Sequence, residues 1–390
     1  MKKMKSLKVL YSSYFGDFTR GGQKSLFGLI NQLDRTHVSP MVLLPEEGEL
    51  ADLLRDIECP VYISPLVNFR KQFFWNIFKP SARNWYKSVK LIRDLIFQLE
   101  PDIIHCDDPN DTVTCGFAIR AAFRSTMRLV WHIRLTGSSS IDQIAARMAD
   151  GLIGVSEGTI QRLGDRKRLL QKFTRIYNGV DLERFHPADN KNQLRQAMSL
   201  PKHRFILLFA GELKKEKGVF EIIKAMNIVK NDMGTTRSPL LLMAGTFINN
   251  ELKRNLEKYI HLYHLQEQVK LLPYQTNIHE WMQASDALIM ASHEGAEGFG
   301  RVIAEAMACG IVPLVANISG CRETIAPDTG LIFEPRSSES LAETIIGFMT
   351  NKDCQNVSRV KGPEHARALF DIRNHARLVE TFYERLLRLE

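Results

Sequence analysis

The sequence lacks the features that mark membrane-spanning, disulfide-stapled and disordered proteins. No apolar run approaches the ~20 residues that a transmembrane helix needs, and residues 205–210 are typical of the short runs present. The six cysteines form no C-x-x-C pair, which argues against a structural zinc site or disulfide framework and favours a reducing compartment. Hydrophobic residues make up 44% and charged residues 25%, so the composition is that of a globular protein.

The charge balance is the one compositional skew. The chain has 52 Lys and Arg against 44 Asp and Glu, a net charge of +8. A basic balance suggests an anionic partner, which could be nucleic acid, a phosphorylated substrate or acidic lipid. The length of 390 residues suggests two or three domains at ~150 residues per domain.

Short apolar runs alternate with stretches of helical period, and the alternation restarts after a polar stretch at residues 187–200. This pattern predicts an α/β fold with two Rossmann-like, parallel-sheet domains, residues 1–187 and 200–372. Strands are predicted at 7–11, 41–44, 102–105, 129–132, 151–155, 205–210, 240–244, 269–272, 287–290 and 313–316. A ligand is expected at the carboxyl ends of the strands, in a cleft between the domains.

The last segment, residues 373–390, has apolar residues at helical spacing. It therefore predicts a terminal amphipathic helix that needs a surface to cover. We expect this helix to pack back on the amino-terminal domain.

The most informative segment spans residues 297–310, between a predicted strand and a predicted helix. Gly298 and Gly300 let the backbone approach a ligand closely, and the N–H groups of Phe299 and Gly300 lie at a helix N-terminus, which favours an anion. Carboxylates accept hydrogen bonds from sugar hydroxyls, so Glu297 and Glu305 suit a hydroxyl-rich, phosphorylated ligand.

This segment reads E-G-F-G-x4-E-A-M-A-C-G, and it resembles the signature of family 4 retaining glycosyltransferases of GT-B fold. Other segments agree with the family in order and spacing, so the resemblance covers nearly the whole chain. These are the glycine pair 21–22, Trp131-His132, the A-D-x4-V-S segment 149–156, N-G-V-D with F-x-P at 178–187, the glycine–lysine segment 211–218 and the G-x2-E turn 320–323.

The resemblance implies transfer of a sugar from a nucleotide-diphosphate donor with retention at the anomeric carbon, without a metal or another cofactor. Glu305 would hold the ribose hydroxyls, and Lys217 with the loop N–H groups would neutralise the departing diphosphate. Glu297 would orient the sugar, and His132 would reach the sugar from the amino-terminal domain. Gly21 and Gly22 would let that domain's first loop approach the phosphates.

The resemblance also suggests an acceptor that is a glycan or a polyprenyl-linked glycan, in bacterial surface polysaccharide, lipopolysaccharide or glycolipid synthesis. Two other functions stay open at this point. One is a nucleotide-sugar epimerase of the same fold, and the other is a non-catalytic nucleotide-sugar-binding protein. The second is favoured by Glu212, which stands where the family commonly has arginine and would repel a diphosphate if it pointed there.

Three acids, Asp107, Asp108 and Asp111, raise the question of a metal site. They surround a proline and no partner histidines recur, so we interpret them as solvated turn residues and expect no metal.

A second basic feature is the stretch 69–90, which interleaves aromatic residues with lysine and arginine and contains no acid. Such a pattern fits a peripheral patch on anionic lipid, and it equally fits a domain core with a solvated basic face. The first interpretation predicts a cytoplasmic enzyme at the inner face of the cell membrane. Nucleic acid is the least favoured partner, because nothing resembles a nucleic-acid-binding module.

Overall fold

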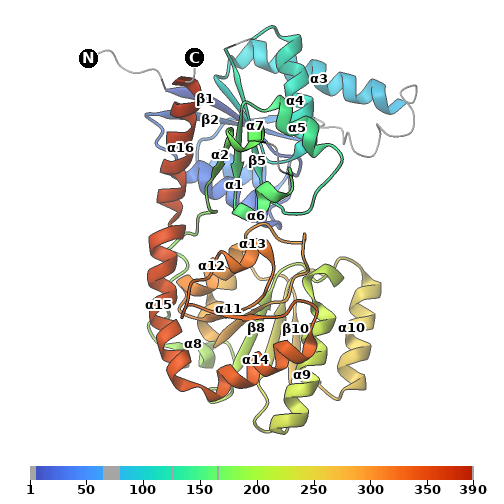
Figure 1. The fold of residues 1–390 in the computed structure, drawn as a ribbon, viewed down its shortest axis with the longest axis vertical. Coiled ribbons are helices and arrows are strands. Elements are labelled where there is room, and N and C mark those ends of the chain that lie inside the picture. The colour runs from blue at the N-terminus through green and yellow to red at the C-terminus, as the bar shows by residue number, and fades with distance from the viewer. Residues whose placement is uncertain (1–5, 65–79, 125, 165–166, 389–390) are drawn as a thin grey trace. The chain divides into compact units, whose positions relative to one another are not determined.

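The computed structural model describes residues 6–64, 80–124, 126–164 and 167–388. They form two compact units, which we call unit 1 (Met1–Gly179 with Ile372–Glu390) and unit 2 (Val180–Asp371). Each unit is a parallel sheet covered by helices, as the alternating pattern predicted (Figure 1). Among the described residues, no helix is both long enough and apolar enough to cross a bilayer.

Unit 1 contains a seven-stranded sheet in the order β3-β2-β1-β4-β5-β6-β7, in which every pair is parallel. Its strands are β1 (Leu7–Ser12), β2 (Val38–Leu44), β3 (Val61–Ile63), β4 (Ile103–Cys106), β5 (Arg128–Ile133), β6 (Gly151–Gly154) and β7 (Phe173–Arg175). Its helices are α1 (Gly21–Gln32), α2 (Glu49–Asp56), α3 (Pro80–Leu99), α4 (Pro109–Ala121), α5 (Asp142–Met148), α6 (Glu157–Gln161), α7 (Lys167–Leu170) and α16 (Ile372–Arg388). The strand order reverses direction between β1 and β4, and in open α/β sheets ligands bind at the carboxyl ends of the strands at such a point.

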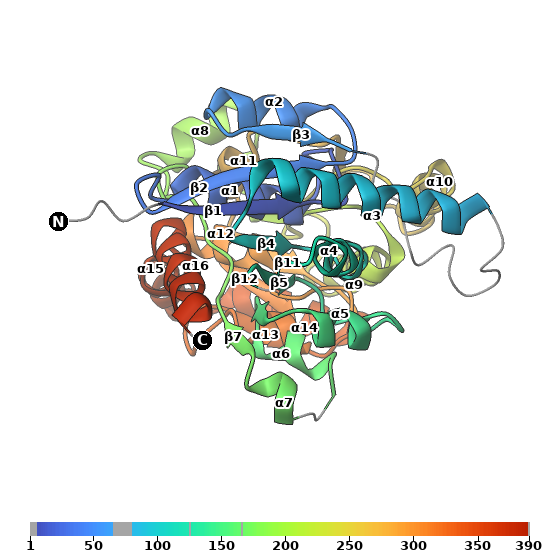
Figure 2. The same ribbon diagram turned by 90° about the horizontal axis from the view of Figure 1, so that it is seen from above.

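Both faces of this sheet are buried, and each face has its own core. Helices α1, α2 and α16 cover one face, where Val379, Phe382 and Tyr383 of α16 pack with residues of β1 and α1. Helices α3 and α4 cover the other face. Figure 2 shows α16 and α3 on opposite sides of the strands. The apolar side of the terminal helix α16 is therefore buried against the amino-terminal part of the chain, as predicted from its apolar spacing.

Unit 2 contains a six-stranded sheet in the order β10-β9-β8-β11-β12-β13, again with parallel pairs throughout. Its strands are β8 (Ile206–Ala210), β9 (Leu240–Ala244), β10 (Val269–Leu272), β11 (Ala287–Met290), β12 (Val312–Ala316) and β13 (Leu331–Phe333). Its helices are α8 (Lys191–Ala197), a short 3₁₀ turn η2 (Lys215–Lys217), α9 (Val219–Met233), α10 (Asn250–Leu262), α11 (Ile278–Ala284), α12 (Arg301–Ala308), α13 (Ser319–Arg322), α14 (Ser338–Thr350) and α15 (Lys352–Phe370).

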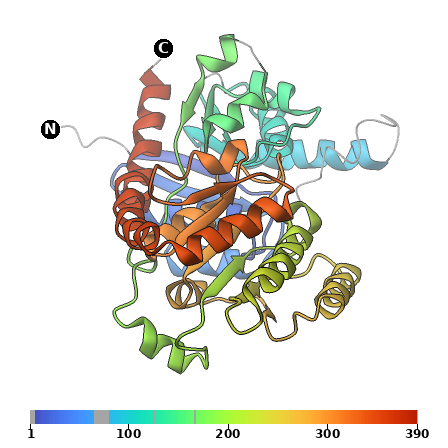
Figure 3. The same cartoon turned by 60° about the horizontal axis from the view of Figure 1, so that its bottom comes forward.

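The sheet of unit 2 reverses its order between β8 and β11, so the loops that follow these two strands leave the same edge side by side. The loop after β8 leads into η2 and α9, and the loop after β11 leads into α12. Helix α14 lies next to α9 (Figure 3). Both segments that the sequence singled out for diphosphate binding thus start from neighbouring strands.

Candidate active site

The loop between β11 and α12 forms a tight backbone turn at the carboxyl edge of the unit 2 sheet. Gly300 is the residue before α12 and has a left-handed backbone, with φ of 69°. A Cβ on Gly320 would lie 2.6 Å from the Gly298 carbonyl oxygen, so the start of α13 presses directly against this loop. Helix α12 has no side-chain cap and no acidic residue in its first turn. Its N-terminus can therefore receive an anion.

Lys217 and Glu297 form an ion pair although 80 residues separate them in the sequence. Lys217 ends η2 after β8, and Glu297 lies in the loop after β11, so the neighbouring strands bring them together. Their side chains are 14% and 17% exposed. Burial and, to a smaller extent, the nearby positive charge of Lys214 together lower the pKa of Lys217 to about 8. A lysine in this setting gains from a second anionic partner.

Gly218 fixes the position of Lys217. Its backbone is left-handed, with φ of 69°, and an added Cβ would lie 2.1 Å from the carbonyl oxygen of Ala291. Only glycine fits this contact between the start of α9 and the end of β11. The lysine and the glycine of the predicted motif therefore have separate tasks, one chemical and one steric.

Glu305 lies on α12, one turn beyond the loop, and is 6% exposed. Arg301, the first residue of the helix, pairs with it, with 3.0 Å between Arg301 Nε and Glu305 Oε1. The glutamate is thus held near the helix N-terminus. The motif analysis did not single out the side chain of Arg301, although its spacing of four from Glu305 is a signal for such a pair.

Two neighbouring glutamates have other partners. Glu294, which precedes Gly295 as Glu297 precedes Gly298, accepts a hydrogen bond from Ser319 Oγ at 2.5 Å. Glu212 pairs with Lys214 at 2.8 Å. The unusual glutamate of the glycine–lysine segment is therefore neutralised by a lysine two residues later.

Phe299 contributes its side chain to the core of unit 2. It is 2% exposed and packs edge-on against Phe370, with 5.2 Å between ring centroids. Its carbonyl oxygen accepts a hydrogen bond from Thr324. The buried ring thus anchors the loop, and only the backbone of this residue can face a ligand.

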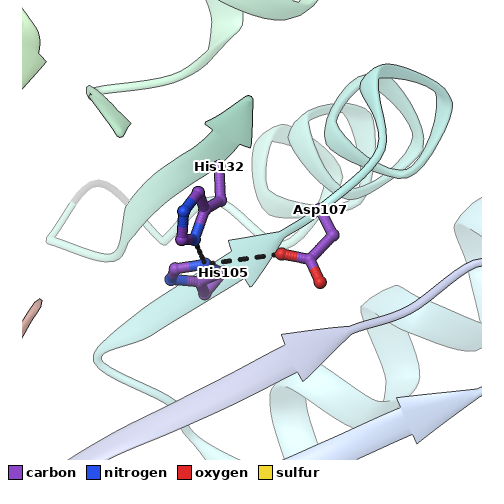
Figure 4. Close-up of side chains that lie close together, drawn as sticks. All are labelled: His105, Asp107 and His132. Atoms are coloured by element: carbon purple, nitrogen blue, oxygen red, sulfur yellow. Dashed lines mark hydrogen bonds and ion pairs between the residues drawn. The ribbon is translucent and has the colours of Figure 1, made fainter. Parts of the chain in front are cut away.

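In unit 1, His132 lies inside β5 and is fully buried. Its Nδ1 atom is 3.2 Å from Nε2 of His105 in the adjacent strand β4, and Asp107 completes the cluster (Figure 4). Burial holds the pKa of both imidazoles well below the usual range, and the positive charge of Arg134 adds to this effect. The predicted contact of His132 with a donor sugar stays a prediction.

The register of β4 and β5 explains this cluster. His105 lies in β4 with Asp107 directly after the strand, and His132 lies in β5 with Arg134 directly after the strand. Residues two apart on a strand share a face, and the parallel register places both pairs on the same face. Tyr383 of α16 covers them, with 2.7 Å between its hydroxyl oxygen and His105 Nδ1.

Our interpretation of the three acids as solvated turn residues is wrong. Asp107 and Asp111 are buried, and Asp108 caps α4 by accepting a hydrogen bond from the Asn110 N–H. The sequence analysis found no histidine partners for these acids, but the structure brings His105 of β4 and His132 of β5 close to Asp107.

Three atoms of His105, Asp107 and His132 lie within 4.8 Å of one another, which is close enough to consider a metal ion. However, Arg134 Nη2 lies 3.0 Å from Asp107 Oδ1 and already supplies a positive charge there. A divalent cation would face this guanidinium, so the arrangement favours the Arg134–Asp107 ion pair over a metal ion.

Gly21 and Gly22 are the first two residues of α1. A Cβ on Gly21 would meet open space, and a Cβ on Gly22 would lie 3.8 Å from Cδ of Arg134. The helix has no side-chain cap and no acid in its first turn. The glycine pair therefore marks a second uncapped helix N-terminus, at the carboxyl edge of the unit 1 sheet.

Two family models match the chain and together cover most of it. Residues 190–364 match the family described as glycosyl transferases group 1, and residues 19–184 match glycosyltransferase family 4. These two matches, one for each half of the chain, show that the chain belongs to the family 4 (group 1) glycosyltransferases of GT-B fold, as the motifs predicted.

Curated relatives include the lipopolysaccharide core biosynthesis mannosyltransferase LpsB of Rhizobium meliloti, 25% identical over 55% of this chain and 61% of that protein. A second is the Escherichia coli UDP-Gal:alpha-D-GlcNAc-diphosphoundecaprenol alpha-1,3-galactosyltransferase, 24% identical over 62% of each chain. The matched region spans only part of the first relatives: 61% of LpsB, and 38% and 50% of two D-inositol 3-phosphate glycosyltransferases from Streptomyces.

Solved structures confirm the fold over nearly the full chain. Anabaena HepE in complex with UDP and glucose has a TM-score of 0.80 at 21% identity, and the alignment covers 98% of this chain and 100% of that one. WaaG, a glycosyltransferase involved in lipopolysaccharide biosynthesis, has a TM-score of 0.71 at 14% identity, with 95% and 98% covered.

Proposed function

We propose that this protein is a retaining glycosyltransferase that moves a sugar from a nucleotide-diphosphate donor to a glycan or lipid-linked acceptor, without a metal. The observation that carries the proposal is the Lys217–Glu297 pair beside the uncapped N-terminus of α12. In the proposal, this pair supplies a cation for the diphosphate and a carboxylate for the sugar, next to backbone donors at one edge of one sheet. The family and the names of the relatives support the same reaction class and a place in bacterial surface glycan or glycolipid synthesis.

In this proposal, the bond between the anomeric carbon and the diphosphate oxygen breaks while a bond to the acceptor hydroxyl forms on the same face. The acceptor proton passes to the departing phosphate. Negative charge develops on the diphosphate, where Lys217 and the N–H groups of the 298–301 loop stabilise it, and this stabilisation supplies most of the rate. Glu297 orients the sugar, and Glu305 accepts hydrogen bonds from the ribose hydroxyls.

The ribose assignment is tested with Glu305→Ala. We expect a rise in the donor KM of at least tenfold with a smaller change in kcat, because a ground-state contact to the nucleotide is lost. Donor binding that equals the wild type would remove Glu305 from the site. A screen of nucleotide sugars by thermal shift identifies the donor first, because a bound donor stabilises the folded protein by mass action.

The role of Glu297 is tested with Glu297→Gln in a transfer assay with product analysis. We expect kcat to fall by more than tenfold, because the amide no longer pairs with Lys217 or orients the sugar. A donor sugar that is epimerised without transfer would support the epimerase alternative. Donor binding with neither reaction would support a non-catalytic binding protein.

We further propose that unit 1 docks on the cytoplasmic face of an anionic membrane. Residues 69–79 of the stretch 69–90 lie outside the described residues. In the described part of α3, Tyr86 is 64% exposed, and Lys87, Lys90 and Leu91 are exposed on the same helix. Rings and cations exposed together suit the lipid headgroup region.

Liposome sedimentation tests this docking. We expect binding to vesicles with anionic lipid, and a severalfold weaker interaction for the Lys87→Glu/Lys90→Glu double variant. The control is Arg254→Glu/Lys258→Glu, which makes the same charge change on exposed positions of α10 in unit 2. Equal binding by both variants, or no binding by the wild type, would refute the docking surface.

A further inference from the structure

Arg134 is a buried cation whose hydrogen-bonding capacity is only partly used. It directly follows β5, and its side chain is 10% exposed. One terminal nitrogen donates to Asn178 Oδ1 at 2.9 Å, and the other lies 3.0 Å from Asp107 Oδ1. Nε and the nitrogen that faces Asp107 are both buried, and neither has a hydrogen-bond acceptor among the described residues. A guanidinium carries five N–H donors in a fixed plane, so this one is held in place and still has donors to give.

Arg134 takes the position at the strand end that the sequence had suggested for His132. Side chains alternate along a strand, so residues 132 and 134 share one face of β5. Arg134 lies two residues, or about 7 Å, closer to the carboxyl edge, where ligands of such sheets bind. His132 is fully buried against His105, whereas the guanidinium lies past the end of the strand.

The first turn of α1 lies next to this guanidinium. Gly22 is close enough that an added Cβ would lie 3.8 Å from Arg134 Cδ. The helix is 12 residues long, has no side-chain cap and has no acid in its first turn. Gly21 borders open space, so its backbone can be approached closely. The partial positive charge of the helix N-terminus and the full charge of Arg134 therefore act on the same point.

We propose that Arg134 is a further phosphoryl-binding residue of unit 1, beside the Gly21–Gly22 turn to which the resemblance assigns the phosphates, with Asp107 and Asn178 as the residues that position the guanidinium. A phosphoryl group matches both parts, because its several oxygens can accept from the planar guanidinium and from backbone N–H groups together. Its identification as a substrate phosphoryl rests on the proposed function. The group belongs either to the nucleotide-sugar donor or to a diphosphate-linked acceptor.

The test is titration calorimetry with inorganic pyrophosphate on the full chain. We expect Arg134→Gln to weaken pyrophosphate binding by about tenfold, and Arg134→Lys to weaken it by less, because lysine keeps the charge without the planar donors. The matched control is Arg175→Gln, an exposed arginine of unit 1 that pairs with Glu157. Each titration is repeated in a Lys217→Gln background, which removes the cation of unit 2.

Unchanged pyrophosphate affinity in Arg134→Gln, in both backgrounds, would overturn the proposal. Because Arg134→Gln leaves Asp107 without its cation, the Arg134→Gln/Asp107→Asn variant provides a second version in which no buried charge is unpaired. Melting curves for all variants establish that they are folded.

Steady-state kinetics then separate the two sources of the phosphoryl group. A raised KM for the nucleotide sugar identifies the donor, and a raised KM for a polyprenyl-diphosphate acceptor identifies the acceptor. Wild-type kinetics in Arg134→Gln for both substrates would contradict the proposal. A wild-type protein without transferase activity would refute the proposed function alone, since the pyrophosphate titration does not depend on it.

Discussion

At the scale of single residues, Gly218 shows how a backbone conformation sets the chemistry of its neighbour. Gly218→Ala would combine a left-handed backbone with a Cβ 2.1 Å from the Ala291 carbonyl oxygen. We expect a loss of roughly 1–3 kcal/mol in the free energy of unfolding and a fall in kcat, because Lys217 must move. Chemical denaturation and transfer assays measure the two effects.

The control for this substitution is Gly347→Ala. Gly347 is exposed in the interior of α14, where an added Cβ meets nothing within 4 Å. This variant should be more stable than the wild type by about 0.5–1 kcal/mol, because alanine has the higher helix propensity. Equal destabilisation by both variants would contradict the steric argument.

His375 gives a prediction about pH. Burial lowers its pKa from 6.5 to about 4, with a further contribution from the charge of Arg134. The unfolded chain therefore binds a proton that the folded chain does not, and stability is lost as the pH falls from 6.5 towards 4. The full effect is about 3 kcal/mol, or about 1.4 kcal/mol per pH unit.

The His375→Gln variant removes this proton. Its own stability at pH 7.5 is the reference, and the measured quantity is the slope of unfolding free energy against pH between 6 and 4.5. We expect a shallower slope than in the wild type. Parallel slopes would show that His375 is not protonated on unfolding in this range.

At the scale of elements, α16 contributes to the core of unit 1 from the far end of the chain. Phe382 is 4% exposed, and a Cβ on Gly151 of β6 would lie 2.6 Å from its ring. We expect Phe382→Ala to lower the free energy of unfolding by about 3–5 kcal/mol, because the cavity lies between helix and sheet. Leu378→Ala is the control on the same helix, since Leu378 is 46% exposed and should change stability little.

The long buried strands and amphipathic helices could be predicted from the sequence, whereas short edge elements could not. Strands β3, β7 and β13 have three residues each, too few for a period to be recognised. Helix α4 is buried almost all round, so it has no polar face to reveal its period. Local sequence carries little signal for either kind of element.

The pairing of Lys217 with Glu297 follows from sequence and topology together, because motif residues after adjacent parallel strands meet at one edge. The cluster around His105 could not be predicted in this way. It depends on the register between β4 and β5 and on the position at which Tyr383 of α16 crosses them. Neither is recorded in a local pattern.

At the scale of the whole molecule, the two units have separate cores, and unit 2 contains a buried polar cluster around Asp286, which we call its polar hub. Asp286 accepts hydrogen bonds from Lys191, Arg195 and the Ile206 N–H, and so joins α8 to the start of β8. Asp286→Ala would leave the buried Arg195 without its carboxylate, at a cost of about 3–5 kcal/mol.

This hub allows the independence of the units to be measured by calorimetry. We expect Asp286→Ala to lower the unfolding transition of unit 2 and Phe382→Ala to lower that of unit 1, because each substitution acts within one core. A donor nucleotide should raise the transition that Asp286→Ala lowers. A single transition that both variants shift equally would contradict this expectation.

The chain leaves unit 1 after Gly179 and returns at Ile372, and within unit 2 the residues at these two crossings are bonded to each other. Val180 and Asp371 form an isolated parallel bridge, and the Val180 N–H donates to the Phe370 carbonyl oxygen at 2.6 Å. Residues 180–371 thus form a closed cassette, inserted at one place in the rest of the chain. The corresponding segment of a relative that uses a different donor could replace residues 180–371 through two chain junctions, 179/180 and 371/372, which lie next to each other in the structure. Under the proposed function, in which unit 2 binds the donor nucleotide, recombination could then alter the donor sugar while the sequence of unit 1 stays unchanged.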